Sequence, residues 1–253
     1  MSAQTVLSAE HCTVAYGRRV IQRDLNFAVS KGDIFIIMGG SGCGKSSLLR
    51  VLMGLLPPAE GKIFYGGTDF WGQPPSGRDA LMRRCGVLFQ SGALWSSRTL
   101  AENICLPIER YTHISRPHAM EIASFKLAQV GLSGFENYYP SEISGGMRKR
   151  AGLARALALD PEIVFFDEPS AGLDPLSAAQ LDELILSLRD SLGMTVLIVT
   201  HELASIFAIG SNSVWLDAET KTALAHGDPK ELVRSGPDKV RAFLRRGKKD
   251  AEA

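Results

Sequence analysis

The chain has 253 residues, of which 45% are apolar and 22% are charged, and its formal net charge is +1. This length suits one large domain, or one domain with an inserted lobe, and the composition is that of an ordinary globular protein. A charge this close to zero speaks against a nucleic-acid partner.

No stretch of the sequence has the character of a membrane span or a secretion signal. The longest apolar runs, such as Ile34–Met38 and Thr195–Val199, are far shorter than the ~20 residues that a spanning helix needs. Residues 1–10 lack a basic segment followed by an apolar one. The cysteines have no Cys-x-x-Cys spacing, so we expect free thiols in the reducing cytosol. They are Cys12, Cys43, Cys85 and Cys105.

Residues 7–65 are expected to be mostly strands. The expected strands are Thr13–Ala15, Leu25–Val29, Ile34–Met38 and Lys62–Tyr65. A helix is expected from Lys45 to about Leu56, where the pair Pro57 and Pro58 would stop it.

The later elements alternate between strands and helices. A short buried strand is expected at Val87–Phe89, and helical patterns run from Gly92 to about Leu159. Two further strands, Ile163–Phe166 and Val196–Val199, enclose a helix that ends at Gly193. That helix is expected over Leu176–Leu192, with apolar residues at helical spacing: Leu181, Leu184, Ile185 and Leu188. The alternation predicts an α/β fold with a mostly parallel sheet covered on both faces.

A glycine-rich loop stands between the strand Ile34–Met38 and the following helix. The segment Gly39–Ser46 matches the pattern G-x-x-x-x-G-K-[ST]. Glycine backbone can bring several N–H groups close to phosphate oxygens, and a helix N-terminus favours the same anion. Lys45 would face the β- and γ-phosphates, and Ser46 would bind Mg²⁺. We therefore assign nine loop residues to nucleotide binding: Gly39, Gly40, Ser41, Gly42, Cys43, Gly44, Lys45, Ser46 and Ser47.

Two acids follow the apolar strand Ile163–Phe166. In a parallel sheet the carboxyl ends of the strands line the ligand crevice, so Asp167 and Glu168 are expected there. We expect Asp167 to position the metal and Glu168 to act as general base on the attacking water. The alternative is a strand that ends in a solvated acidic turn.

Further marks surround these two motifs in a fixed order. They are Tyr16, Gln90 after Phe89, Ile143–Met147 before a long helix from Arg148 to Leu159, Ser170–Asp174, and His201 after Thr200. Each has a plain alternative when taken singly: a half-buried strand residue for Tyr16, a turn residue for Gln90, a helix cap for Ser144, and a structural histidine for His201. In this order and spacing, from about Val6 to Gly227, they resemble the ATP-binding subunits of ABC transporters.

The resemblance implies a P-loop NTPase (RecA-like) core with a mostly parallel sheet, an antiparallel β portion and an inserted α-helical subdomain. The core would be residues 1–91 and 160–235, the subdomain residues 92–159, and the basic tail residues 236–253. ATP and Mg²⁺ are the implied cofactors. Tyr16 resembles the aromatic that stacks on adenine, and Gln90 resembles the Q-loop glutamine beside the metal. His201 resembles the switch histidine at the γ-phosphate, so Glu168, His201 and Gln90 form the implied catalytic set.

The segment around Ser144 resembles the signature motif of this family. The resemblance implies that Ser144, Gly145 and Gly146 bind the nucleotide of the opposite subunit, so that a homodimer clamps two ATP molecules. Met147 stands where most members carry Gln. Its side chain cannot donate the usual hydrogen bonds, but Ser144 and the backbone donors remain.

Several segments resemble the lipid-transport branch, which includes the ATPases of Mla and Mce-type phospholipid transporters. They are Phe89–Leu94, Asn103, Met147–Ala156 and Ala225–Gly227. The implied location is the cytoplasmic face of the bacterial inner membrane, as a peripheral subunit on a membrane-embedded permease, with an Mce-domain protein as a further partner. The alternatives are an ABC transporter ATPase for another small molecule, or a soluble ABC ATPase such as one for iron–sulfur cluster assembly.

Three further expectations concern single segments. A groove around Ala93, Leu94, Trp95 and Leu100 is expected to dock the permease, with Trp95 as anchor unless it packs inside its own lobe. Cys43, beside Lys45 and a helix N-terminus, is expected either to have a lowered thiol pKa or simply to fit a tight loop. The tail has apolar residues at helical spacing among basic ones, and it would either dock on a partner subunit and anionic lipid or cap its own domain. Those residues are Val240, Phe243 and Leu244, with Arg241, Arg245, Arg246, Lys248 and Lys249.

Overall fold

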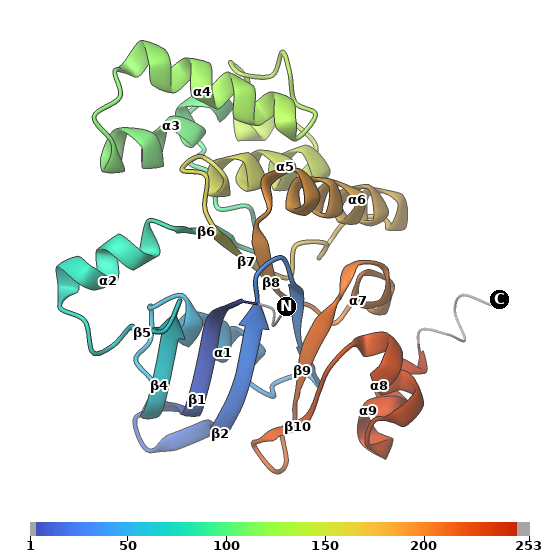
Figure 1. Cartoon of the computed structure of the whole chain (residues 1–253). Helices are drawn as coiled ribbons and strands as arrows, with labels where there is room; N and C mark the ends of the chain where they lie inside the picture. Colours follow the sequence, from blue (N-terminus) through green and yellow to red (C-terminus); the bar gives the residue numbers. More distant parts are fainter. Residues whose placement is uncertain (1–3, 247–253) are drawn as a thin grey trace. The chain divides into compact units, whose positions relative to one another are not determined.

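The computed structural model describes residues 4–246. The chain divides into two compact units, one formed by the residues up to Met82 and from Thr195 onward, the other by Arg83–Met194. Each unit is built around its own strands and helices (Figure 1).

The first unit contains an antiparallel sheet in the order β2-β1-β4-β5. Its strands are β1 (Thr5–Tyr16), β2 (Arg19–Ser30), β4 (Glu60–Tyr65) and β5 (Thr68–Asp69). The inward-facing side chains along β2 include Leu25, Phe27 and Val29, which are buried. This sheet confirms the antiparallel portion that was expected, with longer strands than the sequence patterns indicated.

The same unit has a second group of strands around β3 (Ile34–Gly39), which is buried at every residue. β3 pairs in parallel with β8 (Thr195–Val199) on one side and with β9 (Asn212–Leu216) on the other, and β10 (Ala223–His226) joins β9 in antiparallel fashion. Burial on both faces explains why β3 is continuously apolar and not alternating.

Helix α1 (Lys45–Leu52) contacts β1 of the antiparallel sheet and β3 and β8 of the parallel strands. It ends four residues before the expected end. Gly54 has a φ of 69°, and the N–H groups of Gly54 and Leu55 donate to the carbonyls of Val51 and Arg50 at 3.1 and 2.9 Å. Gly54 therefore ends the helix in a Schellman motif, before the proline pair is reached.

This unit has four further helices, which the sequence patterns did not clearly predict. They are α2 (Pro75–Met82), α7 (Leu203–Ile209), α8 (Pro229–Ser235) and α9 (Asp238–Leu244). Only α9 falls in a segment where helical spacing had been noted. Strands β9 and β10 were not expected either, because their residues lie among polar turns.

The expectation that the tail docks its apolar side on a partner is wrong. Val240 and Leu244 are fully buried within the single chain, and the Phe243 ring packs edge-on against Trp215 with centroids 4.6 Å apart. Lys239 adds an ion pair of 2.5 Å to the Asp217 carboxylate. The helix α9 therefore caps its own unit, the alternative that the sequence left open. Lys248 and Lys249 lie outside the described residues.

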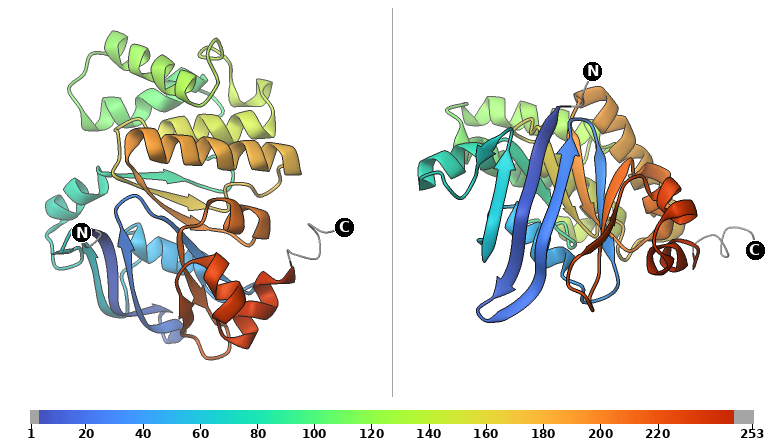
Figure 2. Two further views of the ribbon diagram at one scale, coloured as in Figure 1. Left: turned by 45° about the vertical axis from the view of Figure 1, so that its right-hand side comes forward. Right: turned by 60° about the horizontal axis from the view of Figure 1, so that its bottom comes forward.

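The second unit combines two parallel strands, β6 (Cys85–Leu88) and β7 (Ile163–Asp167), with four helices. The helices are α3 (Leu100–Tyr111), α4 (Arg116–Gln129), α5 (Gly145–Ala156) and α6 (Pro175–Leu192), with a 3₁₀ turn at Pro140–Glu142. Helix α5 packs on β6 with one side and on α3 and α4 with the other, and α6 runs beside it (Figures 1 and 2). The cap of α6 by Gly193, with a φ of 65°, is confirmed.

The expected fold class is confirmed, because the chain combines parallel strands, a separate antiparallel sheet and helices. The helical residues 92–159 all lie in the second unit, together with β6, β7 and α6. Among residues 4–246, no helix is both long and apolar enough to cross a membrane.

Candidate active site

The loop between β3 and α1 has a backbone that only glycine adopts easily. Gly39, Gly42 and Gly44 have φ angles of 149°, 73° and 100°. A Cβ atom on Gly39 would lie 2.3 Å from the Leu216 carbonyl oxygen, and one on Gly44 would lie 2.4 Å from Cγ2 of Ile21. The crest of the loop, by contrast, is exposed. Gly39 and Gly44 are therefore required where the loop packs against the rest of its own unit, while the opposite side of the loop is open to solvent.

Lys45 and Gln22 hold this loop in shape. The Lys45 ammonium donates to the carbonyls of Gly39 and Gly40 at 3.0 and 3.1 Å. Gln22, fully buried on β2, donates through Nε2 to the carbonyl of Cys43 at 2.7 Å and to that of Asp217 at 2.8 Å. The sequence analysis did not single out Gln22. A polar residue at an inward-facing position of a strand could have indicated a buried hydrogen-bonding role.

These loop residues fit the phosphates of a nucleotide. The N-cap residue of α1 is Gly44, which has no side chain to bond the first turn of the helix. The first N–H groups and the positive end of the helix dipole therefore favour an anion at this place. Ser46 is exposed, and its hydroxyl oxygen is of the kind that Mg²⁺ binds.

Tyr16, at the end of β1, is 43% exposed and lies next to α1. Its hydroxyl accepts a hydrogen bond from Arg50 Nη1 at 3.2 Å. A hydrogen bond with Ser47 is the main cause of the lowered pKa of the Tyr16 phenol, and the hydrogen bond with Arg50 adds to it. The structure thus brings Tyr16 and Ser47 together, and it leaves much of the aromatic ring exposed to a ligand.

The parallel register brings His201 to the edge that carries the phosphate loop. Ile37 of β3 pairs with Val199 of β8, so Gly39 and His201 both lie two residues beyond a paired position. The His201 side chain is 59% exposed, and its Nε2 lies 3.8 Å from Glu202 Oε1. An exposed imidazole at a strand edge does not match the alternative of a structural core histidine.

Parallel strand pairing also aligns site residues in the second unit. Leu88 of β6 pairs with Phe166 of β7, so Gln90 and Glu168 each lie two residues beyond a pair. Gln90 is exposed in a turn that Gly92 closes by donating to the Phe89 carbonyl at 2.8 Å. The structure therefore brings Gln90 together with the acids at one edge of the β6–β7 pair.

Asp167 is the last residue of β7, and Glu168 follows with unusual backbone geometry. The φ of Glu168 is 50°, in the left-handed region, and its carbonyl accepts from Ala171 N at 3.2 Å. Such a conformation costs a non-glycine residue about 1–3 kcal/mol and is found preferentially at functional sites. Glu168 is also only partly exposed, which differs from a fully solvated turn.

Ser144 and Asp174 cap the helices that follow them. Ser144 Oγ accepts from Met147 N at 3.2 Å, so the plain alternative of a helix cap is present at α5. Ser144 and Gly145 are nevertheless exposed at that helix N-terminus. Asp174 accepts from Ser177 N at 3.0 Å, and the Ser177 side chain is the main cause of the lowered pKa of Asp174.

The expectation of a lowered thiol pKa for Cys43 is wrong. The residue is 1% exposed, and burial raises the pKa of its thiol more than the nearby Lys45 ammonium lowers it. Its Sγ also lies 2.7 Å from where a Cβ on Gly39 would be. Cys43 is a small residue that fills a tight loop, the alternative that the sequence left open. All four cysteines are free thiols.

Only part of the segment that is expected to dock the permease is exposed to solvent. Leu100 is fully buried and cannot contact a partner, whereas Trp95 is 58% exposed and does not pack inside its own lobe. Asn103 fixes the segment: its Nδ2 donates to the carbonyls of three loop residues, and its Oδ1 accepts from Trp95 N at 2.7 Å. Those three residues are Trp95, Arg98 and Thr99.

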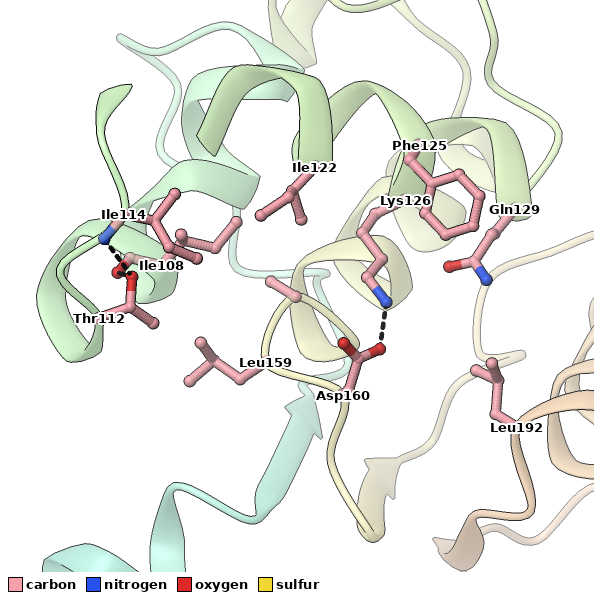
Figure 3. Close-up of a pocket in the computed structure, with 11 residues that line it drawn as sticks. Ile108, Thr112, Ile114, Ile122, Phe125, Lys126, Gln129, Leu159, Asp160 and Leu192 are labelled. Carbon is pink, nitrogen blue, oxygen red and sulfur yellow. Dashed lines mark hydrogen bonds and ion pairs between the residues drawn. The ribbon is translucent and has the colours of Figure 1, made fainter. Parts of the chain in front are cut away.

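A separate cavity of about 430 Å³ lies in the second unit among α3, α4 and the chain after α5. Ile108, Ile122 and Leu159 contribute apolar walls (Figure 3). Figure 3 also shows Lys126 directed at Asp160, with Nζ 2.5 Å from Oδ1. None of the predicted site residues lines this cavity.

Comparison with known proteins identifies a family. The model of the family described as "ABC transporter" matches residues 22–171. The intermembrane phospholipid transport system ATP-binding protein MlaF of Haemophilus influenzae is 38% identical over 96% of this chain and 91% of that protein. The probable ribonucleotide transport ATP-binding protein mkl of Mycobacterium tuberculosis is 40% identical over 92% of this chain and 64% of that protein.

A solved structure agrees with these relatives. A dimeric ATP-binding cassette in a post-hydrolysis state, bound to ADP and Pi, matches with a TM-score of 0.78 at 26% identity. The match covers 88% of this chain and 98% of the cassette. The chain belongs to the ABC transporter family, whose members bind ATP, and it is an ATP-hydrolysing subunit of that family.

Proposed function

We propose that this chain powers a transporter that moves phospholipid between the membranes of a bacterial envelope. The observation that carries the proposal is the similarity to MlaF of Haemophilus influenzae, which extends over nearly the whole of both chains. That protein's name assigns it to intermembrane phospholipid transport.

The motif residues of the first unit would bind the nucleotide. Backbone N–H groups of the phosphate loop and the Lys45 ammonium would contact the phosphates, and Tyr16 would stack on the adenine. His201, which shares the strand edge with Gly39, would contact the γ-phosphate. Lys45 now bonds the Gly39 and Gly40 carbonyls, so it would exchange these contacts for phosphate oxygens on binding.

The residues at the β6–β7 edge would carry out hydrolysis. Mg²⁺, when bound, would neutralise charge on the phosphate oxygens. Ser46, Asp167 and Gln90 are the proposed ligands. Glu168 would accept a proton from the attacking water, and its left-handed backbone would hold the carboxylate in a fixed direction.

The chain would act as a homodimer beneath a membrane-embedded permease. ABC ATPases form dimers and work with permease components, and Ser144, Gly145 and Gly146 would contact the nucleotide of the opposite subunit. The chain would then be peripheral on the cytoplasmic face of the inner membrane, with an Mce-domain protein as a further partner. Trp95 would anchor the permease, because it is a large exposed aromatic in a segment that Asn103 fixes.

Reconstitution tests the cargo. The chain, co-purified with its membrane partners, is placed in vesicles with labelled phospholipid, and we expect Mg-ATP-dependent transfer of that lipid to acceptor vesicles. Trp95→Ala should reduce transfer and co-purification of the permease while ATP binding by the isolated chain stays unchanged. Leu55→Ala, which alters an exposed apolar residue of the first unit, is the matched control. ATP hydrolysis without any lipid transfer would overturn the assignment of phospholipid as the cargo.

Ribonucleotide transport is the second candidate. The 40% identity to the mycobacterial mkl protein favours it, although the match spans 64% of that protein. The same vesicles loaded with labelled ribonucleotide separate the two: ATP-dependent nucleotide movement with no lipid transfer would select this alternative.

A further inference from the structure

Helix α5 turns one face toward the segment Gln90–Ala93. Lys149, Gly152 and Arg155 are spaced by three residues, so they share a side of the helix. All three contact the loop after β6. Sequence reasoning assigned a role to the first residues of α5 only, because those carry the signature motif.

Lys149 is the most buried cation of this face, with 6% exposure. Its ammonium donates to the carbonyl of Gln90 and, at 3.3 Å, to the carbonyl of Glu168. A buried ammonium needs such partners because an unpaired charge in this environment is costly. Burial lowers the pKa of Lys149, and the Glu168 and Asp167 carboxylates act in the opposite direction.

The strand register explains how one ammonium reaches two segments that are far apart in sequence. Gln90 and Glu168 stand at the same level beyond the pair Leu88 and Phe166. Lys149 projects from α5, which packs on β6. The Glu168 carbonyl that it binds belongs to a residue with a φ of 50°, so the bond supports an uncommon backbone conformation.

Other contacts hold the loop to α5 without Lys149. Arg155 donates to the Ala93 carbonyl at 2.6 Å and to the Gly92 carbonyl at 3.1 Å. A Cβ on Gly152 would lie 3.0 Å from the Gly92 carbonyl oxygen, so helix and loop touch directly. Removing the Lys149 ammonium should therefore leave the packing of the loop on α5 in place.

We propose that Lys149 is a positioning residue for ATP hydrolysis, which fixes the backbones of Gln90 and Glu168 relative to each other and to helix α5. The proposal rests on the proposed function, in which Glu168 is the general base and Gln90 contacts the metal. Lys149 would act through the carbonyls of Gln90 and Glu168, to which its ammonium donates. The Lys149 side chain would thus link helix α5 to the residues that carry out hydrolysis.

The test compares hydrolysis with nucleotide affinity in the full-length chain, co-purified with its membrane partners. Lys149→Met keeps the length of the side chain and removes the ammonium. We expect kcat to fall on the order of 10²-fold, the effect of misplacing a reacting group by about 1 Å, with the KM for ATP changed less than about twofold. Lys149→Arg, which keeps a cationic donor, should recover at least about tenfold of that loss.

Two further variants decide whether the loss is specific. Arg150→Met removes the neighbouring charge of α5, which bonds Gln180 at 3.0 Å, and should keep the normal kcat. Lys149→Gln removes the charge but retains two N–H donors, and it serves if the methionine variant fails to fold. An unchanged kcat, or a loss of affinity and thermal stability in step with the loss of rate, would overturn the proposal.

A double variant separates this proposal from the proposed function. In a Glu168→Gln background, Lys149→Met should slow hydrolysis by less than about tenfold, because one of the two residues through which it acts is already disabled. Full additivity of the two losses would overturn the positioning role. If Glu168→Gln alone keeps normal turnover, the general-base assignment fails, and the Lys149→Met and Lys149→Arg pair still reports on Lys149.

Discussion

The functional residues follow the carboxyl ends of two pairs of parallel strands, which we call the β3–β8 edge and the β6–β7 edge. The two edges hold these residues in different ways. At the β3–β8 edge, the phosphate loop is held by its own glycines, by the Lys45 ammonium on neighbouring carbonyls, and by the buried amide of Gln22. At the β6–β7 edge, Gln90 and Glu168 are held by the buried Lys149 of α5. The first edge is mostly built from consecutive residues, and the second needs three distant segments.

The comparison shows why the two edges differ in how they can fail. A change in the phosphate loop alters the place that binds the nucleotide, so affinity should suffer first. A change at the β6–β7 edge alters groups that act on the bound nucleotide, so the rate should suffer first. Substitutions at the two edges should therefore separate binding from turnover.

The largest expected effect is at the β6–β7 edge. Glu168→Gln removes the proton acceptor while the phosphate loop is untouched, so ATP hydrolysis should fall by roughly 10²- to 10⁴-fold with ATP affinity retained. Phosphate release and nucleotide binding measure the two quantities. The mutant should accumulate as an ATP-bound dimer in sedimentation. Glu162→Gln, a charge removed at the other end of β7, should keep its rate within about twofold. Equal losses in both variants would contradict the assignment.

Lys45→Ala should produce the converse result. Loss of a charged hydrogen bond to phosphate, about 1.5–3 kcal/mol, corresponds to roughly 10- to 100-fold weaker ATP binding. Titration with a fluorescent ATP analogue measures the affinity. Lys31→Ala, at an exposed turn, is the control. ATP affinity that stays normal in Lys45→Ala would remove the distinction between the two edges.

Gly44→Ala tests whether the loop is fixed by its own backbone. The new Cβ would meet Cγ2 of Ile21 at 2.4 Å in addition to the strain of a φ of 100°. Gly32→Ala has a φ of 81° with no atom within 4 Å of the new Cβ, so it carries the strain alone. We expect Gly44→Ala to lower the free energy of unfolding by about 1–3 kcal/mol more than Gly32→Ala in urea titrations. Equal stabilities would show that the loop moves to accommodate the methyl group.

The local parts of this molecule could be predicted from the sequence. The phosphate loop, the strand before it and the paired acids depend on neighbouring residues, whose patterns carry their own physical reasons. The cap at Gly193 is of the same kind. The end of α1 is a local feature that was misjudged, because Gly54 ends the helix before the prolines do.

The other parts depend on contacts between distant segments. Gln22 meets Asp217, and Lys149 meets Gln90 and Glu168, across 195, 59 and 19 residues respectively. No spacing rule links such positions. The apolar face of α9 was noted, but its place against Trp215 could not be read from the sequence, because β9 itself was not expected.

The next prediction concerns Cys43, which lies inside the phosphate loop. A loop fixed by its own backbone keeps this thiol buried, and burial raises its pKa above the ordinary 9.0. At pH 7 only a small fraction is thiolate, so maleimide should label the folded chain slowly, and Mg-ATP should add little protection. Mass spectrometry after timed labelling measures the rate. Rapid, ATP-protected labelling that disappears in Cys43→Ser would show that the loop opens.

The raised thiol pKa values also give stability a pH dependence with a definite sign. Burial raises the pKa of Cys12 from 9.0 to about 12. Well below pH 9 the thiol is protonated in both states, and its contribution to stability is fully present. Between pH 9 and 12 the unfolded chain loses its proton first, so the free energy of unfolding should fall as the pH rises. Urea midpoints at pH 8 and pH 10 measure this, and Cys12→Ala should flatten the dependence. A midpoint of the natural chain that rises over this interval would contradict the burial of the thiol.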